Sequence, residues 1–261
     1  MAEIVIVRDE ETAGALAAEA IVTLIRSTPD AVLGLATGAT PLTTYRALAS
    51  RIRDERIDVG GVRGFALDEY VGLPPGHPES YRGVIAREVV APLGLTPEYI
   101  RVPSGDPATI QTAGADYEAA IGAAGGVDLQ ILGIGRTGHI GFNEPGSSLA
   151  SLTRVKTLTE STRHDNARFF ESPGQVPMHC ITQGIGTILR ARHLVLLAFG
   201  HAKADAVAAA VEGPVSTSSP GSAIQLHPNT TVIVDESAAS KLKYVDYYRY
   251  AWSNKPEWQS L

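Results

Sequence analysis

Cysteine is the scarcest residue in this chain of 261 amino acids, which contains only Cys180. A single cysteine excludes an internal disulfide, and we therefore expect the protein to work in a reducing cytoplasm. The thiol stands next to His179 and is a candidate nucleophile on that ground alone. A lone cysteine is more often inert packing, so we assign Cys180 no chemistry.

The sequence also lacks a long apolar run and a surplus of positive charge. No apolar segment reaches the roughly 18 residues that span a bilayer, and the first residues, MAEIVIVRDEE, have neither the basic nor the apolar region of a secretory signal. We therefore expect no membrane association. The 28 Asp and Glu residues outnumber the 22 Lys and Arg residues, for a net charge of −6. This balance disfavours nucleic-acid binding but allows a local basic pocket for a small anion.

What the sequence does contain is an alternation of short apolar runs with longer segments of helical period. We expect strands at 3–7, 31–37, 63–70, 127–135, 154–159, 193–200 and 230–236. We expect helices at 11–27, 41–54, 79–94, 109–125 and 201–213. Several strand candidates are apolar throughout, as in strands buried on both faces. The pattern predicts an α/β fold with an open, largely parallel, doubly wound sheet, Rossmann-like, and helices on both faces.

No stretch rich in Pro, Gly or Ser divides the chain, and no repeat or low-complexity tract interrupts it. We therefore expect a single domain over residues 1–261. In an open sheet of this kind, ligands bind beyond the carboxyl ends of the strands. The loops that follow strands are thus the places to look for chemistry.

The first such loop is LATGATPLTTY, residues 35–45. Gly38 and Ala39 allow the backbone to turn, Thr40 is a candidate helix cap, and Pro41 suits the first helical position. Exposed amides at such a helix start form an anion site. A plain strand-to-helix turn explains the loop equally well, since no lysine follows and the segment is not a Walker motif.

The second loop, FALDEYVGLPPGHPESY, places Asp68 and Glu69 at the end of an apolar strand. Alternation along a strand sends the two carboxylates in opposite directions, so only one can face a given cleft. A partly desolvated carboxylate on a rigid strand end is suited to taking a proton from a carbon next to a carbonyl or imine. A solvated or helix-capping acid pair is the alternative.

The third loop, LGIGRTGHIGFNEPG, has the spacing G-x-G-x-x-G at Gly133, Gly135 and Gly138. A dinucleotide site requires a helix to begin near the third glycine, but HIGFNEPGSS follows, and its glycines and proline disfavour a helix. We therefore expect a loop that presents His139 and Glu144, and no NAD site. These two residues lack a third ligand at a recognisable spacing, so we expect no metal.

Two basic residues are candidates for holding an anion. Arg168 lies among aromatic residues in STRHDNARFF, and Lys203 follows the apolar run HLVLLAFG at the start of a helix. Arginine binds phosphate through two parallel hydrogen bonds and lysine supplies a point charge. Each of them taken alone is more often an ordinary surface residue.

Taken together, the segments LGLATGATPLTTY, LDEYVGLPPGHPESY, GHIGFNEPGSSLASLTRVKTLT, ARFF and AVEGP resemble the glucosamine-6-phosphate deaminase (glucosamine-6-phosphate isomerase) family. The resemblance runs in order from about residue 3 to residue 240 without large insertions. It implies an enzyme that isomerises and deaminates D-glucosamine 6-phosphate to D-fructose 6-phosphate and ammonia in amino-sugar catabolism. No cofactor or metal is implied, because the carbonyl and imine of the substrate act as the electron sink.

The resemblance also implies residue roles. His139 would move the proton that opens the pyranose ring, Asp68 would carry a proton from C2 to C1, and Glu144 would assist His139 and handle the amine protons. The phosphate of the sugar would be held by Thr37, Gly38, Ala39, Thr40, Arg168 and Lys203.

This sequence departs from the family pattern at two positions of the site. Many relatives have an aspartate two residues before the histidine, where this chain has Thr137. A hydroxyl can orient the imidazole but cannot raise its pKa as a carboxylate does. We therefore expect Glu144 to be the sole charged partner of His139 and the imidazole to be less basic. Ala39 replaces a common glycine, a modest change if its φ is negative.

Some bacterial relatives are hexamers activated by N-acetylglucosamine 6-phosphate at a site between subunits. The motif of that site is matched by Ser147, Arg154, Lys156 and Thr157. A tyrosine that belongs to the same site aligns without gaps onto Arg249, although Tyr247, Tyr248 and Tyr250 lie close to that position. The resemblance therefore leaves activation and a homohexamer open.

The sequence also leaves competing functions. Galactosamine 6-phosphate differs from the implied substrate only at the C4 hydroxyl, which no residue pattern decides. A related sugar-phosphate lactonase shares the fold, but Asp68 and the FNEP turn are harder to explain in it. A catalytically inactive sugar-phosphate sensor is favoured by Thr137 alone and opposed by the joint presence of Asp68, His139 and Glu144.

Overall fold

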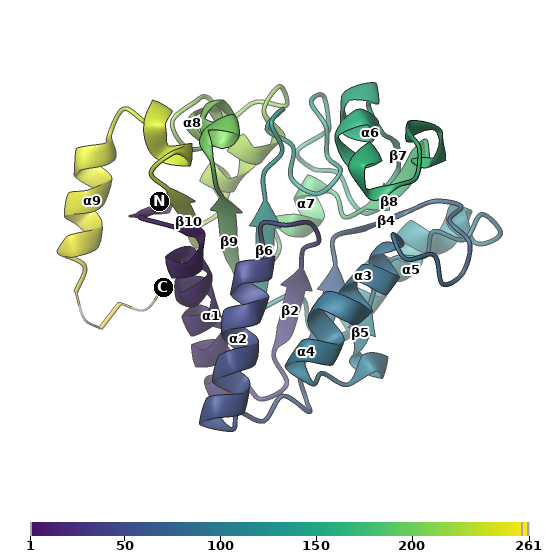
Figure 1. Cartoon of the computed structure of the whole chain (residues 1–261), viewed down its shortest axis with the longest axis horizontal. Coiled ribbons are helices and arrows are strands. Elements are labelled where there is room, and N and C mark those ends of the chain that lie inside the picture. Colours follow the sequence, from purple (N-terminus) through teal and green to yellow (C-terminus); the bar gives the residue numbers. More distant parts are fainter. Residues whose placement is uncertain (1, 257, 260) are drawn as a thin grey trace.

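Seven parallel strands form the central sheet in a computed structural model that describes residues 2–256, 258–259 and 261 (Figure 1). Every neighbouring pair in this sheet is parallel, in the order β1-β10-β9-β6-β2-β3-β5. The strands are β1 (Glu3–Val7), β10 (Thr230–Asp235), β9 (His193–Ala198), β6 (Leu129–Gly133), β2 (Val32–Leu35), β3 (Arg63–Ala66) and β5 (Ile100–Arg101). The expected parallel α/β fold is confirmed.

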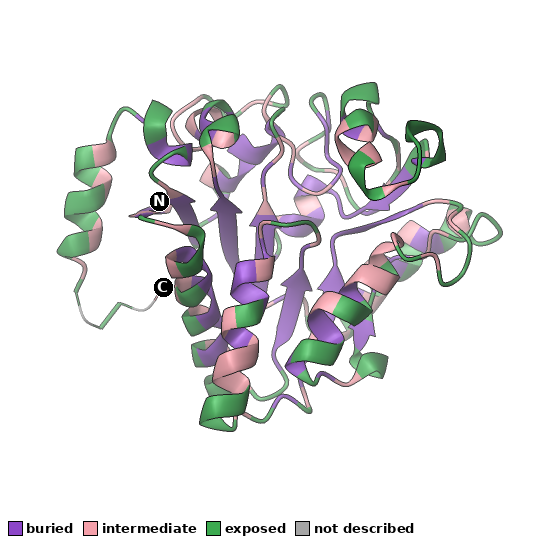
Figure 2. Ribbon diagram, viewed as in Figure 1, coloured by how far each residue is buried: buried purple, intermediate pink, exposed green. Residues whose placement is uncertain are grey.

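The central strands β9 and β6 are buried, apart from the half-buried Gly133 at the end of β6, because helices cover both faces of the sheet (Figure 2). Every residue of β9 is buried, and β6 runs beside it in register from Leu129 opposite His193 to Gly133 opposite Leu197. The continuous apolar runs in the sequence reflect this double burial. Their side chains form the main core together with the inner faces of the flanking helices.

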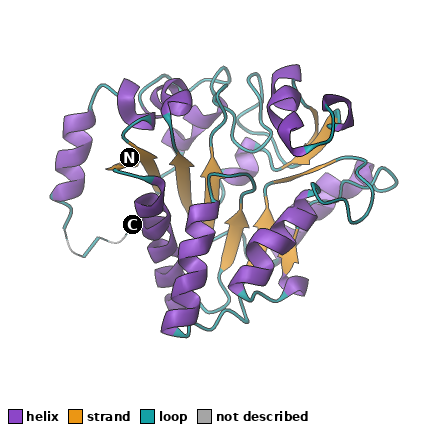
Figure 3. Cartoon of the chain, viewed as in Figure 1, coloured by secondary structure: helices purple, strands orange, loops and turns teal. Residues whose placement is uncertain are grey.

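The helices that flank the sheet are, in chain order, α1 (Glu10–Ser27), α2 (Leu42–Glu55), α3 (Tyr81–Ile85), α4 (Ala91–Leu93), α5 (Ile110–Ala123), α6 (Glu160–Asn166), α7 (Ile185–Ile188), α8 (Ala204–Val211) and α9 (Val245–Ser253) (Figure 3). A π-helical segment, Ala86–Val90, joins α3 to α4. The five expected helices are present, whereas α6, α7 and α9 were not predicted. Among the described residues, none of the helices has the length and hydrophobicity that a membrane crossing requires.

A second, antiparallel sheet lies beside the carboxyl ends of the central strands. It consists of β4 (Asp68–Tyr70), β8 (His179–Thr182) and β7 (Arg154–Thr157), in the order β4-β8-β7. The prediction of one strand over 63–70 was wrong, because the chain leaves β3 at Leu67 and joins the smaller sheet at Asp68. The amide of Leu67 still donates to Leu35, while its carbonyl accepts from Gln183.

The strand order changes direction between β2 and β6. From β2 the chain proceeds outward to β3 and β5, and from β6 it proceeds in the opposite direction to β9 and β10. A switch of direction between neighbouring parallel strands opens a ligand-binding crevice at their carboxyl ends. The loops that follow β2 and β6 are the first and third loops considered above. The topology therefore brings these two loops together.

Candidate functional site

Asp68 and Glu69 are both buried, but they have different surroundings. Glu69 accepts hydrogen bonds from the backbone amides of Tyr70, Tyr81 and Arg82, at 2.8, 2.8 and 2.9 Å. It thereby binds the start of α3, where unpaired amides need acceptors. Asp68 points to the opposite side of β4, as strand alternation requires. Of the two acids, only Asp68 is left for chemistry.

The surroundings of Asp68 favour the neutral, protonated form of its carboxyl group. Burial, and next the negative charge of Glu69, raise the pKa of Asp68 from 3.8 to about 8, against a smaller lowering effect from a hydrogen bond donated by the amide of Phe142. Asp68 as a whole is only 5% exposed to solvent. A carboxyl with a pKa near the working pH can both take up and release a proton, as a general acid–base catalyst must.

The loop after β6 is irregular, as expected. Residues 136–150, all of which the structure describes, contain no helix, so the G-x-G-x-x-G spacing does not form a dinucleotide site. The amide of Gly135 donates to the carbonyl of His139 at 2.9 Å, and this bond closes the turn. A Cβ atom at Gly135 would lie 2.1 Å from the ring of His139. Glycine is required there because the imidazole packs directly on the backbone.

His139, Thr137 and Glu144 form a hydrogen-bonded relay. The hydroxyl of Thr137 donates to Oε2 of Glu144 at 3.1 Å and lies 2.9 Å from Nδ1 of His139. Since a hydroxyl has one proton, Nδ1 must carry the hydrogen in the second bond. This tautomer leaves Nε2 as the basic nitrogen. Thr137 thus orients the ring without adding a charge.

Glu144 is ionised and is held from several sides. Burial raises the pKa of Glu144, but hydrogen bonding to His139 and its charge, together with the hydroxyls of Thr162 and Thr137, lower it to about 2. Oε2 of Glu144 lies 3.4 Å from Nδ1 of His139. Among the described residues, Glu144 is the one acid within ion-pair distance of His139, and the two form an ion pair when the imidazole is protonated.

Asp68 and the His139 loop meet at the same end of the sheet. The amide of Phe142, three residues after His139, is hydrogen-bonded to Asp68 and also donates to Oγ1 of Thr182 at 3.2 Å. Gly141 adopts a φ of +52°, and a Cβ there would lie 3.5 Å from Oδ2 of Asp68. The two candidate catalytic groups are therefore joined through one short segment of backbone.

The loop after β2 runs through the four residues expected to bind phosphate, Thr37, Gly38, Ala39 and Thr40. Gly38 has a φ of +90°, whereas Arg56 is the one residue other than glycine with positive φ in the described part of the chain. Alanine at position 39 therefore fits without strain. The helix begins at Leu42, and no side chain caps it in the described structure, so the predicted cap by Thr40 was wrong. The hydroxyl of Thr37 hydrogen-bonds to Tyr81.

Lys203 and Arg168 come together with two residues that the sequence did not single out, Arg136 and Asp165. Burial lowers the pKa of Lys203, and so do the nearby charges of Arg136 and Arg168, while Asp165 opposes them. Arg136 follows β6 and Lys203 follows the adjacent β9, whereas Arg168 comes from the turn Ala167–Phe169 after α6. Three basic side chains and one acid thus gather at one end of the sheet.

Helix α6 covers this end of the sheet and contacts the other site elements. Thr162 donates a short hydrogen bond to Oε1 of Glu144. Asn166 donates to the hydroxyl of Tyr70, at the end of β4, at 2.9 Å. Sequence reasoning missed this helix because it spans only seven residues. A usable signal was present in Thr159, which caps the helix by accepting from the amide of Thr162.

The four residues that match the activator motif do not share one face. Arg154, Lys156 and Thr157 lie on β7, where alternation puts Thr157 opposite the other two. Thr157 is 3.3 Å from Nδ1 of His179. Ser147 is buried, and its hydroxyl has no partner in the described part of the molecule. Arg249, in α9, pairs with Glu236 at 2.5 Å.

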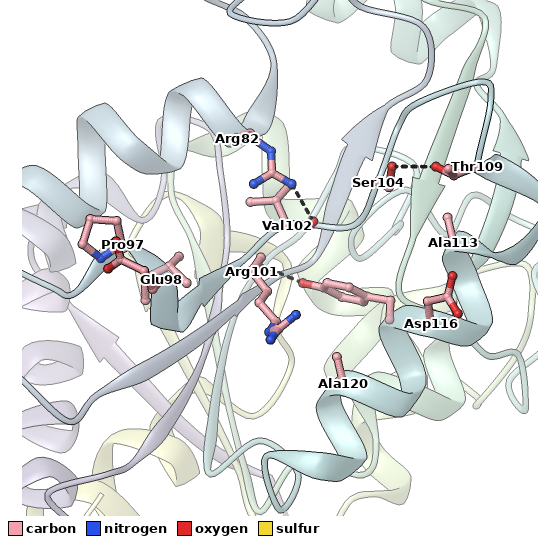
Figure 4. A pocket seen from close by; sticks show the side chains of 12 residues that line it. Arg82, Pro97, Glu98, Arg101, Val102, Ser104, Thr109, Ala113, Asp116 and Ala120 are labelled. Atoms are coloured by element: carbon pink, nitrogen blue, oxygen red, sulfur yellow. Dashed lines mark hydrogen bonds between the residues drawn. The ribbon is translucent and has the colours of Figure 1, made fainter.

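A cavity of about 400 Å³ lies at the β5 edge of the central sheet, among α3, β5 and α5 (Figure 4). Its lining includes Arg82, Arg101 and Tyr117, but none of the predicted site residues, all of which are described. Tyr117 closes its inner wall by donating to the carbonyl of Ala66 at 2.7 Å. The predicted site residues therefore do not line this cavity. The described residues contain no cluster of three or more side chains arranged to bind a metal.

The chain is similar to known proteins over nearly its whole length. Residues 9–233 match the family described as glucosamine-6-phosphate isomerases/6-phosphogluconolactonase. The chain is 60% identical over 270 residues to a glucosamine-6-phosphate deaminase of Bifidobacterium longum, with 100% of both chains covered. It is 60% identical over 260 residues to one of Streptomyces coelicolor, with 99% of this chain and 100% of the relative covered. A solved monomeric glucosamine-6-phosphate deaminase superposes with a TM-score of 0.89 at 40% identity, covering 92% of this chain and 99% of that one.

Proposed function

Since this chain belongs to the glucosamine-6-phosphate isomerase/6-phosphogluconolactonase family, we propose that it is a glucosamine-6-phosphate deaminase. It is an enzyme that acts on a small amino-sugar phosphate and releases fructose 6-phosphate and ammonia. The observation that carries the proposal is the juxtaposition of Asp68 with the relay of His139, Thr137 and Glu144. Carrying a proton from C2 to C1 requires a group that can both accept and return a proton, and the raised pKa of Asp68 supports that role.

The first step is ring opening. Nε2 of His139 is the free base, because Nδ1 is held as N–H by the hydroxyl of Thr137. This nitrogen takes the proton of the C1 hydroxyl and delivers it to the ring oxygen, which gives the open-chain aldehyde. Ionised Glu144 stabilises the imidazolium that forms in between.

The second step moves hydrogen from C2 to C1. The carboxylate of Asp68 removes the C2 proton while the C1 carbonyl takes up the electron pair, and the C1 oxygen receives a proton from the substrate's ammonium group, which becomes the free amine. Asp68 then returns a proton to C1, and the nitrogen lone pair forms an imine at C2. Water adds to the imine and ammonia leaves, so that fructose 6-phosphate remains. Burial of Asp68 supports this role, because a desolvated carboxylate is the stronger base.

Substrate binding is assigned to the loop of Thr37, Gly38, Ala39 and Thr40 and to the cations Arg168 and Lys203. The loop follows β2 at the switch point, where anions bind in folds of this kind. The charge of Arg168 contributes to lowering the pKa of Lys203, after the larger effects of burial and Arg136. A phosphate dianion relieves the repulsion between neighbouring cations.

The test is ammonia release from glucosamine 6-phosphate, with galactosamine 6-phosphate measured in parallel. We expect release from the first epimer, with a kcat/KM at least about tenfold higher than for the second, an amount that one well-placed hydrogen bond supplies. Preference for galactosamine 6-phosphate would reassign the substrate. Binding of both without ammonia release would indicate a sensor and overturn the proposal.

The oligomeric state and activation belong to the same proposal. Arg154 and Lys156 share one face of β7 and suit a second phosphate, so we propose that they and Ser147 form an activator site for N-acetylglucosamine 6-phosphate in an oligomer. Because a similar deaminase of known structure is monomeric, the oligomeric state and the response to the activator should be measured on the same preparation. Light scattering and rates measured with and without that sugar phosphate decide them. We further propose a cytoplasmic location, since the single cysteine suits a reducing compartment.

A further inference from the structure

Arg136 lies in the turn between β6 and His139, and its side chain contacts Asp165 on α6. Its Nη2 atom is 2.6 Å from Oδ1 of Asp165. Both side chains are well exposed, at 56% and 40%. An exposed pair of this kind contributes little to stability, about 0–1 kcal/mol. The pair is therefore free to exchange partners with little loss of folding free energy.

The surroundings of this pair are strongly basic. Burial has the largest effect on the pKa of Lys203 and lowers it. The charges of Arg136 and Arg168 lower this pKa further, whereas the charge of Asp165 raises it. Three positive groups and one negative group leave a net charge of +2 in this cluster. That charge equals the magnitude of a phosphate monoester dianion. Among the described residues whose charges act on Lys203, Asp165 is the one acid.

The backbone that carries Arg136 is held in a fixed turn, which suits a ligand-binding side chain. The turn that carries it is closed on both sides by backbone bonds, from Gly135 to the carbonyl of His139 and from Gly138 to the carbonyl of Gly135, each at 2.9 Å. Its position after β6 is next to the segment after β9 that carries Lys203. A planar guanidinium on a fixed turn can bind two phosphate oxygens at once.

We propose that Arg136 is a third phosphate-binding cation of this site and that Asp165 occupies its guanidinium until the sugar phosphate displaces the carboxylate. The identity of the sugar in this inference rests on the proposed function. The binding of the phosphate group by Arg136 does not depend on it. Arg136 here is a binding residue and takes no part in proton transfer. The alternative is that the pair only fastens α6 over the site.

Two substitutions distinguish phosphate binding by Arg136 from a purely structural pair. They change the affinity for the anion in opposite directions in the first case and in the same direction in the second. If Arg136 binds the phosphate, Arg136→Gln weakens anion binding and Asp165→Asn strengthens it by removing a competitor. If the pair only fastens α6, both substitutions break the same contact and weaken binding alike. Arg136→Lys keeps the charge but loses the paired hydrogen bonds, so binding is partly restored.

The experiment is titration calorimetry of the full chain with inorganic phosphate and with fructose 6-phosphate. We expect a Kd about tenfold higher in Arg136→Gln, the loss of one charge-assisted interaction, and a Kd about two- to fivefold lower in Asp165→Asn. Arg26→Gln is the matched control, because Arg26 forms an exposed pair of similar length with Glu55, at 2.5 Å, on α1 and α2. It should bind as the wild type does. Thermal unfolding verifies that each variant is folded.

A wild-type Kd in Arg136→Gln overturns the inference, and so does equal weakening by both substitutions. Kinetics with glucosamine 6-phosphate add a second readout, since Arg136→Gln should raise KM about tenfold and leave kcat within about twofold. Failure of the proposed function would appear as no ammonia from the wild type while phosphate still binds. The two failures are therefore distinguishable.

Discussion

Replacing Asp68 by asparagine should stabilise the protein in a strongly pH-dependent way while abolishing its activity. The pKa of Asp68 rises from 3.8 to about 8 on folding, roughly four units, and at about 1.4 kcal/mol per unit this is about 6 kcal/mol. That figure is an upper limit, because relaxation around the ionised carboxyl reduces it. We expect at least about 3 kcal/mol to be measurable, since Asp68 is only 5% exposed.

Proton linkage gives the direction in which the stability of the wild type changes with pH. The folded state holds the Asp68 proton up to about pH 8, whereas the unfolded chain loses it near pH 4, so the wild type loses stability as pH rises through this window. The asparagine side chain of the variant titrates in neither state. The free energy of unfolding of Asp68→Asn minus that of the wild type should therefore increase from about pH 4 to about pH 8 and level off above.

Urea unfolding of both proteins between about pH 5 and about pH 9 measures this difference directly. Asp54→Asn is a suitable control, because Asp54 is an exposed carboxyl on α2 with a side-chain exposure of 67%. The same preparation of Asp68→Asn should lose at least about 10³-fold in kcat, the contribution of a positioned general base. Parallel pH profiles for Asp68→Asn and the wild type would refute the reasoning that burial makes this carboxyl a base.

Three further predictions concern the relay. Thr137→Asp adds a carboxylate beside Nδ1 of His139 and should raise its pKa, so that the acid limb of the kcat/KM profile moves to higher pH; an unchanged profile would remove Thr137 from the relay. Gly135→Ala should lower kcat by about 10²-fold, because the new Cβ would lie 2.1 Å from the imidazole, whereas Gly133→Ala, with nothing within 4 Å, should retain activity. Equal rates for these two variants would contradict the close packing. Glu144→Gln should be less stable than the wild type above about pH 4.5, and the deficit should vanish as pH falls toward about 2, because the pKa of Glu144 is lowered to about 2. Urea unfolding across that range measures it, and a deficit that does not change with pH would show that the charge of Glu144 has no role.

The parts of the fold that depend on local pattern were predictable. Apolar runs such as HLVLLAFG gave buried strands, and the residues after Gly138 could not form a helix because glycine and proline interrupt them. The alternation of Asp68 and Glu69 correctly placed the two acids on opposite sides of one strand. The change of sheet at Leu67 was not predictable, because it depends on pairing with β8, a four-residue strand more than a hundred positions later.

The parts of the site that depend on distant contacts were missed for the same reason. Arg136 and Asp165 are 29 positions apart and meet only because α6 folds back over β6. Nothing in the sequence around either residue distinguishes it from an ordinary charged surface residue. The roles of His139, Thr137 and Glu144 remain predictions, although the structure brings the three side chains into one hydrogen-bonded group.

The central claim is that Asp68 carries the hydrogen that leaves C2, and proton NMR of the reaction in deuterated water tests it most directly. The wild type should form fructose 6-phosphate in which part of the product keeps at C1 the hydrogen that Asp68 carried from C2, with deuterium at C1 only in the fraction whose carboxyl proton exchanged before its return. Asp68→Asn should bind fructose 6-phosphate with an affinity within about threefold of the wild type but incorporate no deuterium and release no ammonia. Ammonia release by Asp68→Asn at the wild-type rate would contradict the account.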